Sequence, residues 1–378
     1  MDDGQYNVAV GSRAMLGAST GNNATFNTAV GQASLLSITT GDNNVAVGSN
    51  SADALTTGSD NVAIGYEAMR LHTTGTKNIA IGYGAMNDTD AGSNSSDSDR
   101  NVFIGYDSGG GTWANTKSEN NVAIGSYTMD SALDGATHNT AVGDNALSSI
   151  TTGDNNVMLG SGTGDGVTTG SDNVFIGMDA GNATTDVDKA VIIGSSSASA
   201  DMTSGADGTV GIGYDALNAL TSGAGNTTVG YQTGYSNLTG GYNTLLGYQA
   251  GYNLLTDNNV AIGWQALYKI GDTAGGGHGE NNVAIGPGAM AGGDDTDGNN
   301  TGYKNVAIGT STLGGSTRSS DGDAFTAYYN IAIGHEAGKS VTTGASNVLL
   351  GSLAGDAITT KTGIIAIGLG AAGAISTT

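Results

Sequence analysis

The stretch Asn61-Val62-Ala63-Ile64-Gly65 is the unit from which this chain is built. The same five residues, or close variants, recur at Asn44, Asn78, Asn121, Asn259, Asn282, Asn305 and Asn330. With looser copies, the closing glycine marks twenty repeats, at Gly11, Gly31, Gly48, Gly65, Gly82, Gly105, Gly125, Gly143, Gly160, Gly177, Gly194, Gly213, Gly230, Gly247, Gly263, Gly286, Gly309, Gly334, Gly351 and Gly368. Ten of the nineteen spacings are 17 residues. Such a short, fixed period predicts a stack of similar coils, so we expect one repeat domain over residues 1–378.

The residues just before each marker glycine predict a short β-strand. Val, Ile or Leu always stands one residue before the glycine, and Val, Ile or Thr stands three before it. Alanine usually lies between them, as Ala63 does. Because both alternating sets are apolar, we expect both faces of this strand to be buried. One face would fill the coil, and the other would need another chain or another layer to cover it. Small alanines would suit a crowded seam between chains, although the pattern leaves open which face is which.

The remainder of each repeat predicts a bend, a second weak strand and a turn. A small residue stands three places after the marker, and a Thr-Thr-Gly turn such as Thr56-Thr57-Gly58 follows later. Asparagine stands four places before the marker in seventeen of the twenty repeats. Stacked asparagines can hydrogen-bond from coil to coil, and a polar binding stripe is the alternative interpretation. No stretch keeps a helical period, so we expect no helices.

Five long spacings predict loops that project from the stack. The extra residues lie near 87–100, 109–119, 271–280, 292–303 and 314–329. Insertions at one phase of a repeat protein lie on one face and often carry binding, although plain surface decoration would look the same.

The charge balance excludes several classes of partner. The formal net charge is −23, and Lys and Arg together number only 11. We therefore expect no nucleic-acid binding, and no apolar run is long enough for membrane insertion. The first residues lack the charged and apolar regions of a signal peptide, and the chain has no cysteine. These features are typical of a soluble extracellular particle.

The repeat resembles a known family. The core motif followed by a small residue three places after the glycine, as from Asn61 to Ala68 and from Asn282 to Ala289, resembles the head repeat of YadA-type trimeric autotransporter adhesins. The longer form from Asn243 to Gly251 is similar to repeats of bacteriophage tail-fibre proteins. The resemblance implies an all-β, left-handed parallel β-roll, a β-solenoid of about twenty coils, with three chains packed side by side as a homotrimer.

The resemblance also implies a function. It predicts a structural or adhesive fibre that presents loops to a host cell-surface glycan or protein receptor, without catalysis. The fibre would be extracellular, on a virion tail or a bacterial surface. The period is longer than in adhesin heads, and no heptads follow the last copy. We therefore expect an excised head or a segment of a virion fibre.

Aromatic residues align just after the marker and are candidates for glycan binding. They are Tyr66, Tyr83 and Tyr106 in successive coils, and Tyr214, Tyr231, Tyr248 and Trp264 in another run. Tyr235 and Tyr252 form a second short column. Rings on adjacent coils stack favourably by themselves, and sugars also pack on aromatic faces. Trp113, in an insertion loop, is the strongest single exposed candidate, followed by Phe325, Tyr328 and Tyr329.

One acidic loop suggests an ion site. Asp294, Asp295 and Asp297 place oxygen ligands close together, as calcium loops do, but no glutamate follows at the EF-hand distance. A solvated acidic loop is the alternative, and calcium is the only cofactor that the sequence suggests. The four histidines follow no ligand spacing, and no hydrolase motif is present.

Two other functions remain open from the sequence. The first is an ice-binding solenoid, because threonines such as Thr56 align eight residues after the marker. That column is broken at each long insertion, which disfavours a flat threonine lattice. The second is a glycan-cleaving tailspike, because paired carboxylates could meet across a groove between chains.

Overall fold

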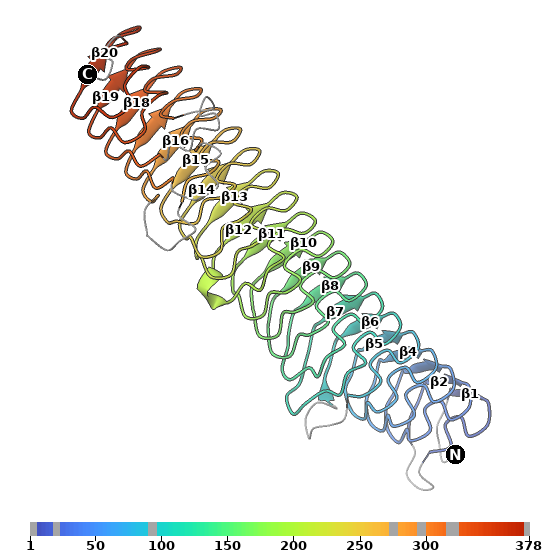
Figure 1. Cartoon of the computed structure of the whole chain (residues 1–378). Helices are drawn as coiled ribbons and strands as arrows, with labels where there is room; N and C mark the ends of the chain where they lie inside the picture. Colours follow the sequence, from blue (N-terminus) through green and yellow to red (C-terminus); the bar gives the residue numbers. More distant parts are fainter. Residues whose placement is uncertain are drawn as a thin grey trace. The chain divides into compact units, whose positions relative to one another are not determined.

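The structure is a computed structural model of the chain, and it describes residues 6–17, 23–89, 97–271, 279–292, 300–314 and 325–373. The chain divides into two compact units, Met1–Lys189 and Ala190–Thr378, which we call the N-terminal and the C-terminal unit. Each unit is a parallel β-solenoid in which every repeat contributes one three-residue strand. In Figure 1 the strands of each unit lie one above the next.

The N-terminal unit contains ten described strands that pair in parallel with their neighbours in sequence. They are β1 (Val8–Val10), β2 (Thr28–Val30), β3 (Val45–Val47), β4 (Val62–Ile64), β5 (Ile79–Ile81), β6 (Val102–Ile104), β7 (Val122–Ile124), β8 (Thr140–Val142), β9 (Val157–Leu159) and β10 (Val174–Ile176). The register pairs equivalent residues of successive repeats, so that Ala63 of β4 lies beside Ala80 of β5. The pairing of β5 with β6 and of β6 with β7 shows that the two long spacings of this unit leave the ladder intact.

The C-terminal unit continues the same pattern with ten more described strands. They are β11 (Val191–Ile193), β12 (Val210–Ile212), β13 (Thr227–Val229), β14 (Thr244–Leu246), β15 (Val260–Ile262), β16 (Val283–Ile285), β17 (Val306–Ile308), β18 (Ile331–Ile333), β19 (Val348–Leu350) and β20 (Ile365–Ile367). The described residues contain no α-helix, and one 3-10 turn, η2, spans Ser204–Ala206. The all-β parallel solenoid predicted from the repeat is therefore confirmed.

The middle residue of each strand faces the inside of the coil. Ala63 and Ala80 have no more than 1% of their surface exposed, and Phe103 and Met158 fill the same position where alanine is replaced. The residues on either side point outward. The expectation that alanines form a seam between chains is therefore wrong. The middle position shares the coil interior with the residue four places after the marker: where Phe103 stands in the middle, that residue is Gly109, and a Cβ added there would lie 2.5 Å from the Phe103 ring. Because these two positions fill the interior, the branched residues on either side of the middle position face out.

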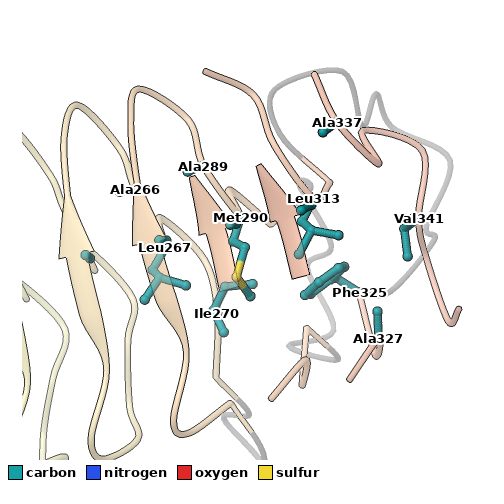
Figure 2. Close-up of a cluster of buried hydrophobic side chains, with 14 of the residues drawn as sticks. Ala266, Leu267, Ile270, Ala289, Met290, Leu313, Phe325, Ala327, Ala337 and Val341 are labelled. Carbon is teal, nitrogen blue, oxygen red and sulfur yellow. The ribbon is translucent and has the colours of Figure 1, made fainter. Parts of the chain in front are cut away.

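The bend after the marker completes the core. In the C-terminal unit, Leu267, Met290 and Leu313 follow their markers by four residues and are fully buried. Figure 2 shows these side chains lying next to one another in successive coils, with Ile270 and Phe325 beside them. Each coil therefore buries its own apolar set against the coils before and after it.

The second weak strand expected in each repeat is absent as a regular strand in the described residues. What remains is a hydrogen-bond ladder: the Thr39 N–H donates to Thr56 O over 2.9 Å, and the Thr56 N–H donates to Thr73 O over 2.8 Å. Each threonine hydroxyl also donates to the same carbonyl. Because one residue per coil carries this ladder, it holds the coils in register without forming a sheet.

The marker glycines are required by close backbone contact. Gly65 has φ of +140°, and a Cβ added there would lie 2.1 Å from the carbonyl oxygen of Gly82 in the next coil. No L-residue with a side chain tolerates both the φ and the contact. The fixed glycine in the sequence therefore reflects the tight stacking of the coils.

The asparagines four places before the markers form a buried ladder. Asn61 Nδ2 donates to Asn44 Oδ1 over 3.1 Å and to the Gly75 carbonyl over 2.9 Å. Asn61 Oδ1 in turn accepts from the Asn78 N–H over 2.9 Å. All four groups lie inside the coil, and the three asparagines are at most 1% exposed. The amide ladder is confirmed, and the alternative of a surface binding stripe is wrong.

Candidate functional site: the outer strand face and the aromatic columns

The outer faces of the strands form an apolar surface along each unit. On β4, Val62 is half-buried and Ile64 is 37% exposed. Both outward positions carry only Val, Ile, Leu or Thr from β1 to β20. Other exposed members are Val8, Val10, Val30, Ile124, Val157, Leu159, Leu246, Ile331, Ile333, Ile365 and Ile367. Within the described chain this face meets no other part of the fold, as the exposed fractions show. It is the second apolar face that the strand pattern predicts.

The aromatic residues after the marker stack as predicted. Tyr66, Tyr83 and Tyr106 form one column, with ring centroids 5.2 and 5.1 Å apart and nearly parallel planes. The second column places the Tyr214, Tyr231 and Tyr248 rings 5.5 and 5.1 Å apart. These side chains are between 41% and 50% exposed.

The stacking geometry limits what the columns can bind. In a parallel stack each ring covers the face of its neighbour, so solvent reaches mainly the ring edges and hydroxyls. A sugar could pack on a ring face only at the end of a column, such as Tyr248 in the second column. Among the described residues no ring contact joins Trp264 to Tyr248, so the predicted run of four stacks only through its three tyrosines; Trp264 is 50% exposed. Glycan binding at these residues stays a prediction.

Two features of this surface were missed in the sequence. Gln232, Gln249 and Gln265, each two places after a marker, form an amide ladder with Nε2 to Oε1 distances of 3.0 and 2.9 Å. Tyr268 extends the predicted Tyr235–Tyr252 column, because its ring centroid lies 5.3 Å from that of Tyr252. Alignment of every repeat by its marker would have found both.

Trp113 is not an exposed loop aromatic. Its side chain is fully buried, lies against Phe103 with 5.6 Å between ring centroids, and donates from Nε1 to the Gly109 carbonyl over 3.1 Å. Phe325 is likewise buried, with 1% exposed. Both expectations of exposure are wrong, because these insertions fold their aromatic residues into the coil core. Tyr328 and Tyr329 are exposed, at 38% and 52%.

Titratable groups inside the coil are few. His72 takes the place that Leu55 holds one coil earlier, and its ring contacts Thr89 Oγ1 over 3.0 Å and Asn78 Nδ2 over 3.2 Å. Burial lowers the pKa of His72 to about 4, although Asp99 and Asp97 oppose the change. Burial raises the pKa of the Asp130 carboxyl to about 6, and Asp107 adds to that rise.

The proposed calcium ligands Asp294, Asp295 and Asp297 lie outside the described residues. Parts of the insertions near 87–100, 271–280, 292–303 and 314–329 do so as well. In the described ranges no three His, Asp or Glu side chains gather closely enough to hold a metal ion. Calcium binding at the acidic loop therefore stays a prediction.

The threonine columns are only partly available to solvent. The hydroxyl of Thr151 donates to the Thr168 carbonyl over 3.0 Å, whereas the adjacent Thr152 is exposed. At this turn the hydroxyl of the first threonine is bonded to the backbone, and the second threonine faces water.

Comparison with known proteins supplies no identity. No protein-family model matches the chain, and no match was found among curated proteins. None of the described helices has the length and apolar character needed to cross a membrane. The function is therefore inferred from the geometry of the coils.

Proposed function

We propose that this protein is a passive extracellular fibre in which three copies pack side by side through their outer strand faces. The observation that carries the proposal is the apolar outer face of each unit, where every described strand presents two aliphatic or threonine side chains and no charge. Soluble monomers rarely expose apolar patches beyond a few hundred Å², so a face of this length calls for a partner.

A second copy of the chain fits this face better than an unrelated protein. Every strand presents nearly the same two side chains, so the face is complementary to itself at every level of the stack. Covering the exposed part of one such Val or Ile side chain is worth about 0.5–1 kcal/mol. Repeated along a unit, this gain is large enough for a permanent assembly. The number three and a left-handed coil come from the resemblance to adhesin and tail-fibre repeats.

The fibre would act by holding receptor-binding surfaces away from a virion or a cell. Candidate surfaces are the exposed aromatic residues, and the receptor would be a host glycan or protein. The repeat positions that build the coil are occupied by packing and by the amide ladder, which supports a role without catalysis. A glycan-cleavage assay and a measurement of thermal hysteresis separate this function from the tailspike and ice-binding alternatives.

The mass in solution tests the assembly. One chain has a mass of 37.1 kDa, and light scattering on the purified protein should give about three times that value. Ile64→Asp combined with Ile124→Asp places carboxylates on the outer face and should dissociate the trimer. Thr57→Asp combined with Thr152→Asp adds the same charge at exposed turn positions and should leave the mass unchanged.

A monomeric mass for the unaltered protein would contradict the proposal. So would an unchanged trimer in the Ile64→Asp, Ile124→Asp variant, because it would place the contact between copies elsewhere.

A further inference from the structure

Three tyrosines of the C-terminal unit form an open corner that the fibre does not require. Tyr303 and Tyr328 each stand six places before a marker in successive coils, and their backbones form an isolated parallel bridge. Their rings stack with centroids 5.3 Å apart. Tyr329 stands upright against both rings, at 68° to Tyr303 and 76° to Tyr328. Tyr328 and Tyr329 remain 38% and 52% exposed.

A cation of the chain itself already occupies this corner. Lys304 Nζ lies 5.6 Å from the ring centroid of Tyr303 and 5.4 Å from that of Tyr329. The two rings meet at a steep angle, so the ammonium group faces both π-surfaces at once. In the described part of the chain no carboxylate lies within ion-pair distance of Lys304, so the aromatic faces are its main electrostatic partners.

The backbone fixes this arrangement. Lys304 and Tyr329 hold the same phase in successive coils, and both adopt the left-handed conformation, with φ of +53° and +55°. The Lys304 N–H donates to the Glu280 carbonyl over 3.1 Å. Glu280 holds the phase of Tyr303 one coil earlier, and its Oε2 is buried without a hydrogen-bond partner in the described residues.

We propose that Tyr303, Tyr328 and Tyr329 form a binding site for a quaternary ammonium group, such as the head group of choline, with Lys304 as the resident cation that the ligand displaces. A cation over two or more aromatic faces is the arrangement by which proteins recognise quaternary ammonium ligands. A trimethylammonium group is less strongly hydrated than the lysine ammonium and needs no hydrogen-bond acceptor. The net charge of −23 raises the local concentration of cations around the chain.

The site goes beyond the proposed fibre, because neither the trimer nor the stacking of coils needs it. It also differs from the other lysine–tyrosine contact of the same unit. Lys269 Nζ lies 5.6 Å from the centroid of the Tyr268 ring. Lys269 and Tyr268 therefore provide a control lysine–tyrosine pair outside the corner.

Calorimetric titration with choline chloride tests the proposal. Binding to the unaltered protein should be weak and saturable. Lys304→Met, which removes the competing ammonium group, should tighten binding by on the order of tenfold. Tyr329→Ala in that background should weaken it at least fivefold, about the effect of losing one ring face. Lys269→Met should leave binding unchanged. The neutral carbon isostere 3,3-dimethylbutan-1-ol should bind much more weakly than choline.

Several results would overturn the site. They are equal binding of choline and its neutral isostere, equal effects of Lys304→Met and Lys269→Met, or no saturable binding of choline to the Lys304→Met protein. The mass of each variant is measured in parallel. A change of mass in Tyr329→Ala would assign the rings to contact between copies and refute the site, whereas a monomeric protein that binds choline would refute the trimer alone.

Discussion

Replacement of Asn61 by alanine should destabilise the N-terminal unit far more than its small change in volume suggests. The side chain takes part in four hydrogen bonds: two from Nδ2, to Asn44 Oδ1 and Gly75 O, and two into Oδ1, from the N–H and Nδ2 of Asn78. The variant loses all four. Asn44 Oδ1 keeps the N–H of residue 61, and Asn78 Nδ2 keeps the Ser98 carbonyl.

Two buried groups then lose a partner, the Asn78 N–H and the Gly75 carbonyl. Each buried group left without a partner costs about 1–3 kcal/mol, so we expect a loss of about 4 kcal/mol in the free energy of unfolding. Urea unfolding followed by circular dichroism measures the total. Hydrogen exchange at the Asn78 amide measures the local effect, and that amide should lose its protection.

Asn23→Ala is the matched control, because Asn23 is exposed in the same unit. It should change the free energy of unfolding by no more than about 0.5 kcal/mol. An Asn61→Ala variant that loses less than about 1 kcal/mol, with the Asn78 amide still protected, would refute the view that the ladder holds the coils together.

Three further predictions follow from the core. Gly65→Ala should prevent local stacking and lower the free energy of unfolding in urea by well over 3 kcal/mol, because its Cβ would overlap the next coil. Gly208 has φ of +70° but open space around it, so Gly208→Ala should lower the free energy of unfolding by only about 1 kcal/mol. The depressed pKa of His72, about 4 against an ordinary 6.5, means that the unfolded chain binds the proton first as pH falls. Stability should therefore fall by about 3 kcal/mol between pH 6.5 and pH 4, and His72→Leu should remove that dependence; equal acid sensitivity in both proteins would contradict this cause. Trp113→Ala should lower the free energy of unfolding, measured by thermal unfolding, by about 3–5 kcal/mol, whereas Trp264→Ala should lower it by less than about 1 kcal/mol. Equal losses in the two variants would contradict the assignment of Trp113 to the core and Trp264 to the surface.

The candidate site was only partly predictable. The ring stacks were foreseen, since rings one repeat apart must lie about one strand spacing apart. Trp113 was misplaced because a polar insertion gives no sign that one of its residues returns to the core beside Phe103. The corner of Tyr303, Tyr328 and Tyr329 was missed as a cluster, because the insertion near 314–329 separates Tyr303 from the other two in sequence.

The sequence by itself determined the stack, its parallel register and the buried asparagine ladder. A period of about 17 residues, with glycine and asparagine at fixed places, admits only coils in which equivalent residues of successive repeats lie next to each other. Only the tertiary structure decided that the alanines face inward and the branched side chains face outward. The alanines and the branched residues are both apolar and alternate along the strand, so hydrophobicity alone cannot show which of the two faces inward. Packing inside the coil decides, because the middle position shares the interior with the residue four places after the marker, as Phe103 does with Gly109.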